Sequence, residues 1–280
     1  MGRGRRFTSY QDYEKALSKG IGIGHAENYQ PWLRAQDVKS HGNRSVIFGL
    51  TTRRNHHFLS SIESDFFYLT EFNDSVVDIR EQFPLFPLNL TRQIAEYLGV
   101  KHPLVRGIPG KDSPVLHVMT TDFVLTMRNA DGNYRYKAVA VKPDKLIPAR
   151  EAEKLEIERL FWTLLGVDFQ IYVGSKQNKI QSKNICWATS AIRMAPDCYE
   201  SLPYEHVLSV LRPGDYPVDE LMDLLAEVLH IERDEAMIML QVIIAKKLIR
   251  VDLTYPIIEV GILRVLSNKY DVGTSVNEHC

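Results

Sequence analysis

Apolar and polar residues in the first half of the chain follow helical and extended spacings in turn. Helical spacing predicts helices over residues 10–17, 58–71 and 150–165. In the second of these helices, the apolar positions are Leu59, Ile62, Phe66 and Leu69. Strand-like segments are predicted at residues 76–79, 117–128, 134–142 and 168–174, with loop or edge structure at residues 83–87. Because strands and helices alternate around one sheet, we expect an α/β core.

The sequence between the two longest predicted strands indicates a β-hairpin. Residues 129–133 read Asn-Ala-Asp-Gly-Asn, which is typical of a tight turn. If the loop is Asp131–Asn133, the numbers of paired residues add to 264, and Asp122 lies opposite Lys142, with Cβ atoms about 5 Å apart. A two-residue Asp-Gly turn would change that sum to 263 and shift the pairing by one residue. The first register places an acid beside a lysine at one end of the sheet.

The second half of the chain has a different pattern. Helices are predicted at residues 204–211, 218–229 and 234–248, followed by strands at 249–253 and 257–266. Three helices followed by a β-wing predict a mainly helical, winged-helix-like domain. Residues 175–197 contain few structural signals, so we place the domain boundary there, giving domains of 1–178 and 179–280.

Composition is ordinary for a globular protein, but charge is unevenly distributed. Of the 280 residues, 45% are hydrophobic and 25% charged, and the net charge is −1. Residues 201–280 contain 7 Lys and Arg against 13 Asp and Glu, a net of −6, which leaves 27 against 22, a net of +5, for residues 1–200. The first part can therefore approach phosphate, whereas the second is better suited to binding a protein.

Several classes of protein are disfavoured. The three cysteines (Cys186, Cys198 and Cys280) form no CxxC pair, which argues against a zinc site or a disulfide framework and fits a reducing cytosol. No apolar run is long enough to span a bilayer, and the basic N-terminus lacks the apolar region of a signal peptide. We expect a cytoplasmic, nucleoid-associated protein that contacts no membrane.

Glu63, Asp122 and Lys142 are the candidate catalytic residues. Glu63 borders the apolar stripe of its helix, where a carboxylate is costly without a partner. Glu63 and Asp122 are expected to bind Mg²⁺, which prefers oxygen ligands and for which Mn²⁺ can substitute, with the carbonyl of Val141 as a further ligand. Such a metal polarises a phosphodiester, while Lys142 orients or deprotonates the attacking water.

Each of these signals has a simpler reading. An Asp opposite a Lys on a hairpin is commonly a surface ion pair, and two distant acids followed by Val-Lys form a degenerate pattern. Arg80, Lys101, His102 and Arg106 are candidate DNA contacts, or equally are solvated basic residues. Adjacent histidines such as His56 and His57 point in different directions, which favours structural or DNA-contact roles over a metal pair.

The wider sequence resembles the TnsA family, the endonuclease subunits of heteromeric cut-and-paste transposases. The resemblance runs in order from about residue 20 to residue 162 and is weak beyond that. The stretches that carry it are 22–25 (GIGH), 29–33 (YQPWL), 56–63 (HHFLSSIE), 77–85 (VDIREQFPL), 91–95 (TRQIA), 101–107 (KHPLVRG), 119–123 (MTTDF), 141–143 (VKP) and 153–159 (EKLEIER).

The resemblance implies a fold, a reaction and partners. The first domain would have a restriction-endonuclease-like core of mixed sheet, with Glu63, Asp122 and Lys142 on the family's catalytic positions. The protein would nick the 5′ ends of a transposon, a TnsB-like transposase subunit would process the 3′ ends, and a TnsC-like ATPase regulator would dock on the C-terminal domain. Ala140 departs from the family, which usually has Gln there, so binding of a second metal is in doubt.

Two other functions remain open. The chain could be a catalytically silent adaptor or winged-helix regulator of a DNA-processing complex, a reading favoured by Ala140 and opposed by the three intact acid and lysine positions. A stand-alone restriction or repair nuclease is a third option, which the acidic second domain disfavours.

Overall fold

The protein divides into two compact units, which are described separately below. In the computed structural model, residues 4–5, 7–38, 43–105, 114–199 and 204–269 are described. The first unit is Met1–Gly174 and the second is Ser175–Cys280. The division therefore follows Gly174, four residues before the boundary after residue 178 that the sequence analysis gave.

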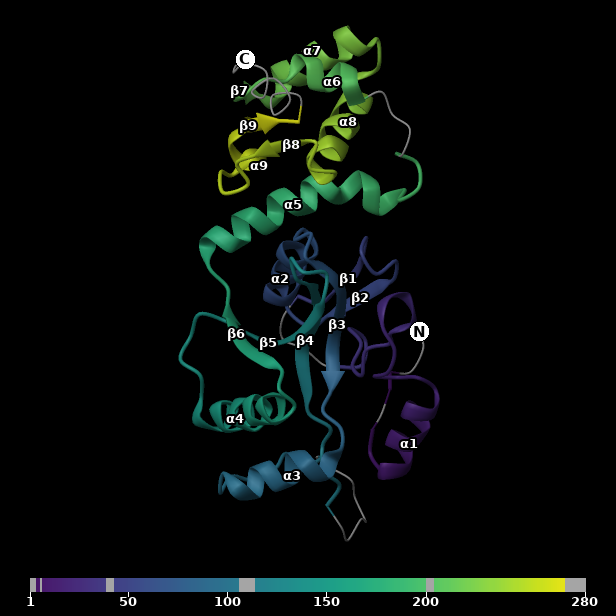
Figure 1. The fold of residues 1–280 in the computed structure, drawn as a ribbon, viewed down its shortest axis with the longest axis vertical. Helices are drawn as coiled ribbons and strands as arrows, with labels where there is room; N and C mark the ends of the chain where they lie inside the picture. Colours follow the sequence, from purple (N-terminus) through teal and green to yellow (C-terminus); the bar gives the residue numbers. More distant parts are fainter. Residues whose placement is uncertain (1–3, 6, 39–42, 106–113, 200–203, 270–280) are drawn as a thin grey trace. The chain divides into compact units, whose positions relative to one another are not determined.

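A mixed four-stranded sheet is the centre of the first unit (Figure 1). Its strand order is β3-β4-β5-β6, with β5 and β6 parallel and the other pairs antiparallel. The strands are β3 (Val76–Pro84), β4 (Thr120–Arg128), β5 (Tyr134–Lys142) and β6 (Asp168–Val173). The expected α/β class is confirmed, and the mixed sheet is consistent with a restriction-endonuclease-like core.

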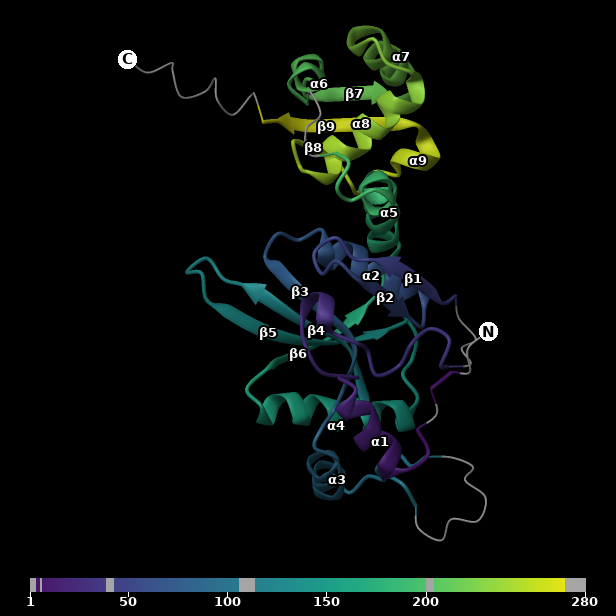
Figure 2. The same cartoon turned by 90° about the vertical axis from the view of Figure 1, so that its right-hand side faces the viewer.

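Helices cover both faces of this sheet (Figure 2). Helix α2 (Ser61–Glu71) packs on one face, where Phe67, Phe123 and Val139 share an apolar cluster. Helices α3 (Leu88–Tyr97) and α4 (Ala149–Leu164) pack on the other face, around Val124, Ala138 and Phe161. Burying the sheet on both sides excludes water from the strands that carry Asp122 and Lys142.

The N-terminal segment covers the outer edge of β3. It contains α1 (Tyr10–Ser18), the 3₁₀ turn η1 (Ala26–Asn28) and a hairpin of β1 (Ser45–Phe48) and β2 (Asn55–Phe58). The Ala26 N–H donates to the Asp78 side chain (3.0 Å), the Tyr29 hydroxyl to the Glu81 carbonyl (3.0 Å), and the Trp32 N–H to the Gln82 carbonyl (3.2 Å). Polar groups along a strand edge that would otherwise remain unpaired are thus satisfied.

The register predicted for the β4–β5 hairpin is wrong. Observed pairs such as Val124↔Ala138 and Arg128↔Tyr134 have numbers that add to 262, rather than to 264. The turn begins earlier than expected, because the Gly132 N–H donates to the Asn129 carbonyl (3.0 Å) and Gly132 has φ +84°. A three-residue loop that ends in a left-handed glycine is a common hairpin connection, and here the loop is 130–132.

Other predictions for the first unit need smaller corrections. The helix predicted from residue 58 starts at Ser61, because residues 55–58 form β2. The strand predicted at 76–79 continues through Pro84, so the first two residues of the expected loop at 83–87 belong to β3. The hairpin β1–β2 and helix α3 were not predicted.

The second unit is mainly helical with a small sheet of strand order β7-β9-β8. Leu221, Leu225, Leu240 and Ile243 lie in its core. Its elements are α5 (Lys176–Met194), α6 (Tyr204–Val210), β7 (Gly214–Pro217), α7 (Val218–Leu229), α8 (Arg233–Ala245), β8 (Ile249–Val251), α9 (Ile257–Val260) and β9 (Ile262–Asn268).

The sequence analysis missed two elements of the second unit and misassigned part of a third. Helix α5 occupies the segment that was expected to be a boundary, and β7 was not predicted. The strand predicted at 257–266 is wrong over its first four residues, which form α9 between Pro256 and Gly261 (φ +71°). Of the residues with a described placement, none forms a helix long and apolar enough to cross a membrane.

Candidate functional site

Asp122 and Lys142 meet at the end of β4 and β5. The Val141 N–H donates to Asp122 Oδ2 (2.8 Å), and Lys142 Nζ lies 3.6 Å from the same oxygen. The proximity that the sequence predicted is therefore confirmed, although the register behind it was wrong. In the observed register Asp122 is level with Ala140, and Lys142 lies two residues further along the same face, within reach of a long side chain.

Glu63 enters the site from the first turn of α2. Ser60 caps this helix: its hydroxyl accepts from the Glu63 N–H (3.3 Å) and donates to Glu63 Oε1 (2.8 Å), while the Leu59 N–H donates to Oε2 (3.0 Å). Burial, together with repulsion from Asp122, raises the pKa of Glu63 to about 7. Glu63 and Asp122 are thus close enough for their charges to interact, and their role as ligands of one metal stays a prediction.

Glu158 is a third acid at this site that the sequence analysis did not single out. It lies on α4 with 6% of its surface exposed, and its Oε1 has no hydrogen-bond partner among the described residues. Burial and repulsion from Asp122 raise its pKa to about 8, against a hydrogen bond with Thr121. The sequence could have indicated Glu158, because it lies between Leu155 and Trp162 on the apolar stripe of its helix. Glu63 was singled out for a similar position on its own helix.

Gln82 is a second residue that the sequence analysis missed. It is level with Asp122 on the neighbouring strand β3, and its Nε2 donates to Asp122 Oδ1 (3.3 Å) while its Oε1 accepts from the Thr120 hydroxyl (2.9 Å). Its backbone has φ +47°, in the left-handed region that residues other than glycine rarely adopt. No sequence signal marks such a kink in a strand.

The residues present fit a divalent cation in charge and donor type. Burial and repulsion from Asp122 raise the pKa values of Glu63 and Glu158, and Lys142, 3.6 Å from Asp122, only partly offsets this, so a bound cation would favour the ionised carboxyls. Carboxylate oxygens are the ligands that Mg²⁺ prefers. Over the described ranges, no three His, Cys, Asp or Glu side chains already stand at metal-binding spacing. Val141 presents its N–H to Asp122, so a role for its carbonyl stays a prediction.

A cleft of about 1160 Å³ opens beside these residues. Lys142 and Glu158 line it, together with the start of α4 and residues 99–105. Lys101 and His102, two of the predicted DNA contacts, lie in its wall. The His102 ring lies 2.8 Å from the Pro103 carbonyl and 3.0 Å from the Thr91 hydroxyl, and burial lowers its pKa, which favours the neutral imidazole.

Of the other two predicted DNA contacts, Arg80 is not among the described residues that line this cleft. Arg80 lies between the rings of Phe83 (5.3 Å) and Tyr136 (5.4 Å) and is 3.3 Å from Asp78. Arg106 lies outside the described residues.

Comparison with known proteins gives two matches. Residues 73–174 match the protein family described as TnsA-like endonuclease N terminal. The chain is also 39% identical over 177 residues to the Escherichia coli protein "Transposon Tn7 transposition protein TnsA". That alignment covers 63% of this chain and 61% of the relative.

The matched family region contains most of the site. Gln82, Asp122, Lys142 and Glu158 lie within residues 73–174, whereas Glu63 lies before them. These matches support the resemblance seen in the sequence: residues 73–174 are similar to the TnsA-like endonuclease N-terminal domain, and the chain spans 61% of the length of its relative.

Proposed function

We propose that the protein is a Mg²⁺-dependent DNA endonuclease that nicks the 5′ ends of a transposon during cut-and-paste transposition. One observation carries this proposal: Asp122, held by a backbone N–H and 3.6 Å from Lys142, interacts with two further buried acids, Glu158 within the region similar to the TnsA-like family and Glu63 just before it. A surface ion pair would not require two neighbouring carboxyls with raised pKa values.

Each residue has a distinct role in this mechanism. Glu63 and Asp122 would hold the cation, which, when bound, polarises the phosphodiester and favours ionised water. The Val141 N–H and the Gln82 amide hold the Asp122 carboxylate in one orientation. Lys142 positions the attacking water and stabilises the charge that develops on the phosphate. Glu158, whose pKa is raised to about 8, is mostly protonated near neutral pH without a cation, so it would accept a proton from that water only once it is ionised.

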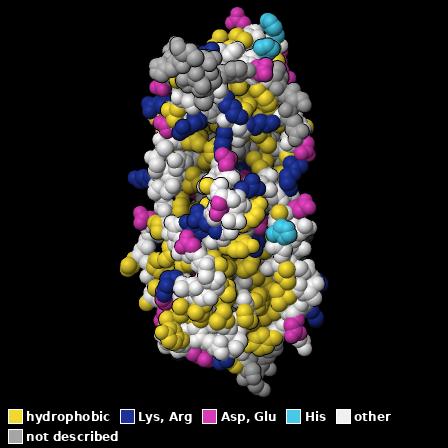
Figure 3. Space-filling model, in the orientation of Figure 1, with side chains coloured by type: hydrophobic (Ala, Val, Ile, Leu, Met, Phe, Trp, Pro, Cys, Tyr) yellow, Lys and Arg dark blue, Asp and Glu magenta, His cyan; other side chains and the backbone are white. Residues whose placement is uncertain are grey.

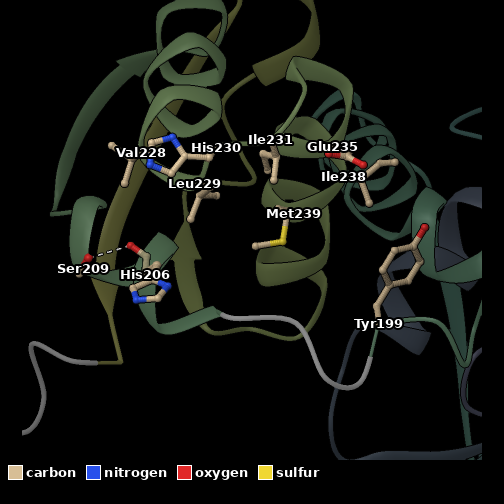
Figure 4. Close-up of a pocket in the computed structure, with 10 residues that line it drawn as sticks. All are labelled: Tyr199, His206, Ser209, Val228, Leu229, His230, Ile231, Glu235, Ile238 and Met239. Atoms are coloured by element: carbon tan, nitrogen blue, oxygen red, sulfur yellow. Dashed lines mark hydrogen bonds between the residues drawn. The ribbon is translucent and has the colours of Figure 1, made fainter.

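We propose that the second unit is a winged-helix-like module that binds protein partners. Helices α6–α8 followed by β8 and β9 support this assignment. A pocket of about 630 Å³ lies between α6, the α7–α8 connection and α8, and Leu229, Ile231, Ile238 and Met239 give it an apolar lining (Figure 4). Helix α7 and the start of α8 are rich in acids, so an apolar segment with basic flanks, supplied by a TnsC-like ATPase regulator, is the proposed occupant.

The main competitor is a catalytically silent adaptor. Two observations favour it: Ala140 presents only a methyl group level with Asp122, and the Glu63 oxygens already accept hydrogen bonds from the helix cap. An adaptor would have no need to bind a cation at the end of this sheet.

The deciding experiment measures nicking of transposon-end DNA with Mg²⁺ or Mn²⁺ and a TnsB-like transposase. Asp122→Asn and Lys142→Ala should bind DNA but lose at least about 10³-fold of the nicking rate. Lys137→Ala is the matched control. Lys137 lies on β5, as Lys142 does, but it pairs with Asp168 of β6 at 4.0 Å, away from the site. Equal rates in all four proteins would establish the Asp122–Lys142 pair as structural and favour the adaptor.

A further inference from the structure

The end of the β4–β5 hairpin furthest from the site carries exposed aromatic and basic side chains. We call residues 126–136 the hairpin arm. Pairing of β5 with β6 begins only at Lys137, so the β5 side of the arm has no neighbouring strand from β6. Figure 2 shows the arm projecting from the body of the first unit. Tyr134 and Tyr136 are 59% and 53% exposed, although both continue the strand face that buries Ala138.

Arginines stack on these two tyrosines. The guanidinium carbon of Arg80 is 5.4 Å from the Tyr136 ring centre, and that of Arg128 is 5.8 Å from the Tyr134 ring centre. Stacking restrains each guanidinium. The Arg80 side chain is 14% exposed and lies 3.3 Å from Asp78, so it is engaged within the fold, whereas Arg128 is exposed and keeps N–H groups that can donate to an anion. Arg135 is also exposed, and Asp131 in the turn is the only acid between residues 126 and 136.

From these contacts we propose that the hairpin arm binds the backbone of duplex DNA beside the cleft. Phosphate is the partner that restrained guanidinium groups match best, and exposed tyrosines can pack against sugar or donate to phosphate. On the surface drawn in Figure 3, Lys and Arg side chains lie among hydrophobic side chains. Since this binding serves the nuclease reaction, the inference rests on the proposed function.

The length of the arm gives the position of the contact. Asp122 and Arg128 are six residues apart on β4, a span of about 20 Å at about 3.4 Å per residue. Along the axis of a duplex, one strand has a phosphate about every 3.4 Å, so an arm that runs along this axis contacts the backbone about six base pairs from the nick. The arm would therefore orient flanking DNA, and the cleft residues would act on the scissile phosphate.

The test is binding of the full chain to a fluorescent duplex of about 30 base pairs, without divalent cation so that no strand is cut. Arg128→Gln combined with Arg135→Gln should weaken binding about tenfold and reduce the slope of log K against log salt by about 2. Tyr134→Ala combined with Tyr136→Ala should weaken binding severalfold with little change in that slope. Both tyrosines are exposed, so their removal should leave the fold intact.

The matched control is Arg92→Gln combined with Arg159→Gln, which removes two exposed arginines from α3 and α4. If the arm variants and the control bind with equal affinity and equal salt slope, the proposal is overturned, as it is if the native chain does not bind duplex DNA. The nicking assay is independent: native protein that binds through the arm but never nicks would contradict the proposed function alone. Arm variants that bind and nick like native protein would contradict the arm alone.

Discussion

Two neighbouring residues of β3 belong to two different clusters of buried acids: Glu81 is part of the first, and Gln82 contacts Asp122 of the second. The two clusters differ in how their charge is balanced. In the first, Glu81 is fully buried and accepts hydrogen bonds from Arg54 (2.6 and 2.9 Å) and from the His57 N–H (3.1 Å), with the His56 ring at 2.8 Å. Burial opposes its charge, but His56 and Arg54 outweigh burial and lower the pKa of Glu81 below its usual range.

The second cluster is the candidate site, where the balance is reversed. Glu63 and Glu158 are also buried, as Glu81 is, yet their pKa values rise to about 7 and about 8. The comparison separates a structural acid, whose cationic partners are built into the fold, from acids that need one more positive charge. His56 belongs to the structural cluster, which agrees with the structural role favoured for it in the sequence.

The largest expected effect comes from breaking the balanced cluster. Glu81→Gln should lower the free energy of unfolding by about 3–5 kcal/mol, because it leaves Arg54 buried without a counter-charge. Urea unfolding at neutral pH, followed by circular dichroism, measures the loss. A loss below about 1 kcal/mol would mean that the cluster is not a structural centre and would remove the contrast.

The same substitution in the other cluster should have the opposite effect on stability. Glu158→Gln removes a carboxyl that resists ionisation, so the free energy of unfolding at pH 8.5 should rise. Nicking should fall by about 10–100-fold, the usual cost of altering a residue next to metal ligands. Destabilisation comparable to that of Glu81→Gln would show that Glu158 is structural.

The pH dependence of stability should differ in sign between the clusters. Glu63 and Glu158 have pKa values above 4.5, so the folded state binds more protons and metal-free stability falls as pH rises from about 4.5 to about 8. Glu81 has a lowered pKa, so its contribution is present above about 4.5 and is lost as pH falls below that value.

Thermal unfolding across pH with and without Mg²⁺ separates these contributions. Mg²⁺ favours ionised carboxyls, so the stabilisation it gives should grow between about pH 6 and pH 8.5. Asp122→Asn should abolish most of that growth. Mg²⁺ stabilisation that does not vary with pH would place the cation elsewhere.

The smallest effect concerns Gln82, which links the two clusters. Gln82→Gly should relieve its left-handed backbone, worth about 1 kcal/mol, while removing the amide that contacts Asp122. We expect little net change in stability and a several-fold weaker affinity for Mg²⁺ by calorimetry. Unchanged affinity would assign Gln82 to backbone geometry alone.

The sequence predicts the residues of the site better than their geometry. Asp122 and Lys142 are adjacent because the change of the paired sum from 264 to 262 is even and keeps both side chains on the same face, within reach of each other. Glu158 could have been found by the reasoning applied to Glu63, because both are acids on an apolar helix stripe. Gln82 could not, since its position depends on a left-handed kink in β3.

Tertiary contacts also decided the elements that the sequence missed. Helix α5 lacks a clear apolar stripe, and its buried positions include Ser182, Asn184 and Thr189. Asn184 donates to the Leu253 and Tyr255 carbonyls, so part of this helix is held by polar contacts with distant backbone. Periodicity of apolar residues cannot reveal a helix of that kind.

The region that matches the family, residues 73–174, is smaller than the first compact unit, Met1–Gly174. A chain beginning at residue 73 would retain Asp122 and Lys142 but would lose Glu63, together with the N-terminal segment that pairs with β3. Its first strand would have an unpaired edge that can pair with other chains. Pro84 would also lose its close packing against Gly22, where an added Cβ would lie 2.5 Å from the Pro84 ring. Such a fragment should aggregate, and its inactivity would say nothing about the chemistry of the intact protein.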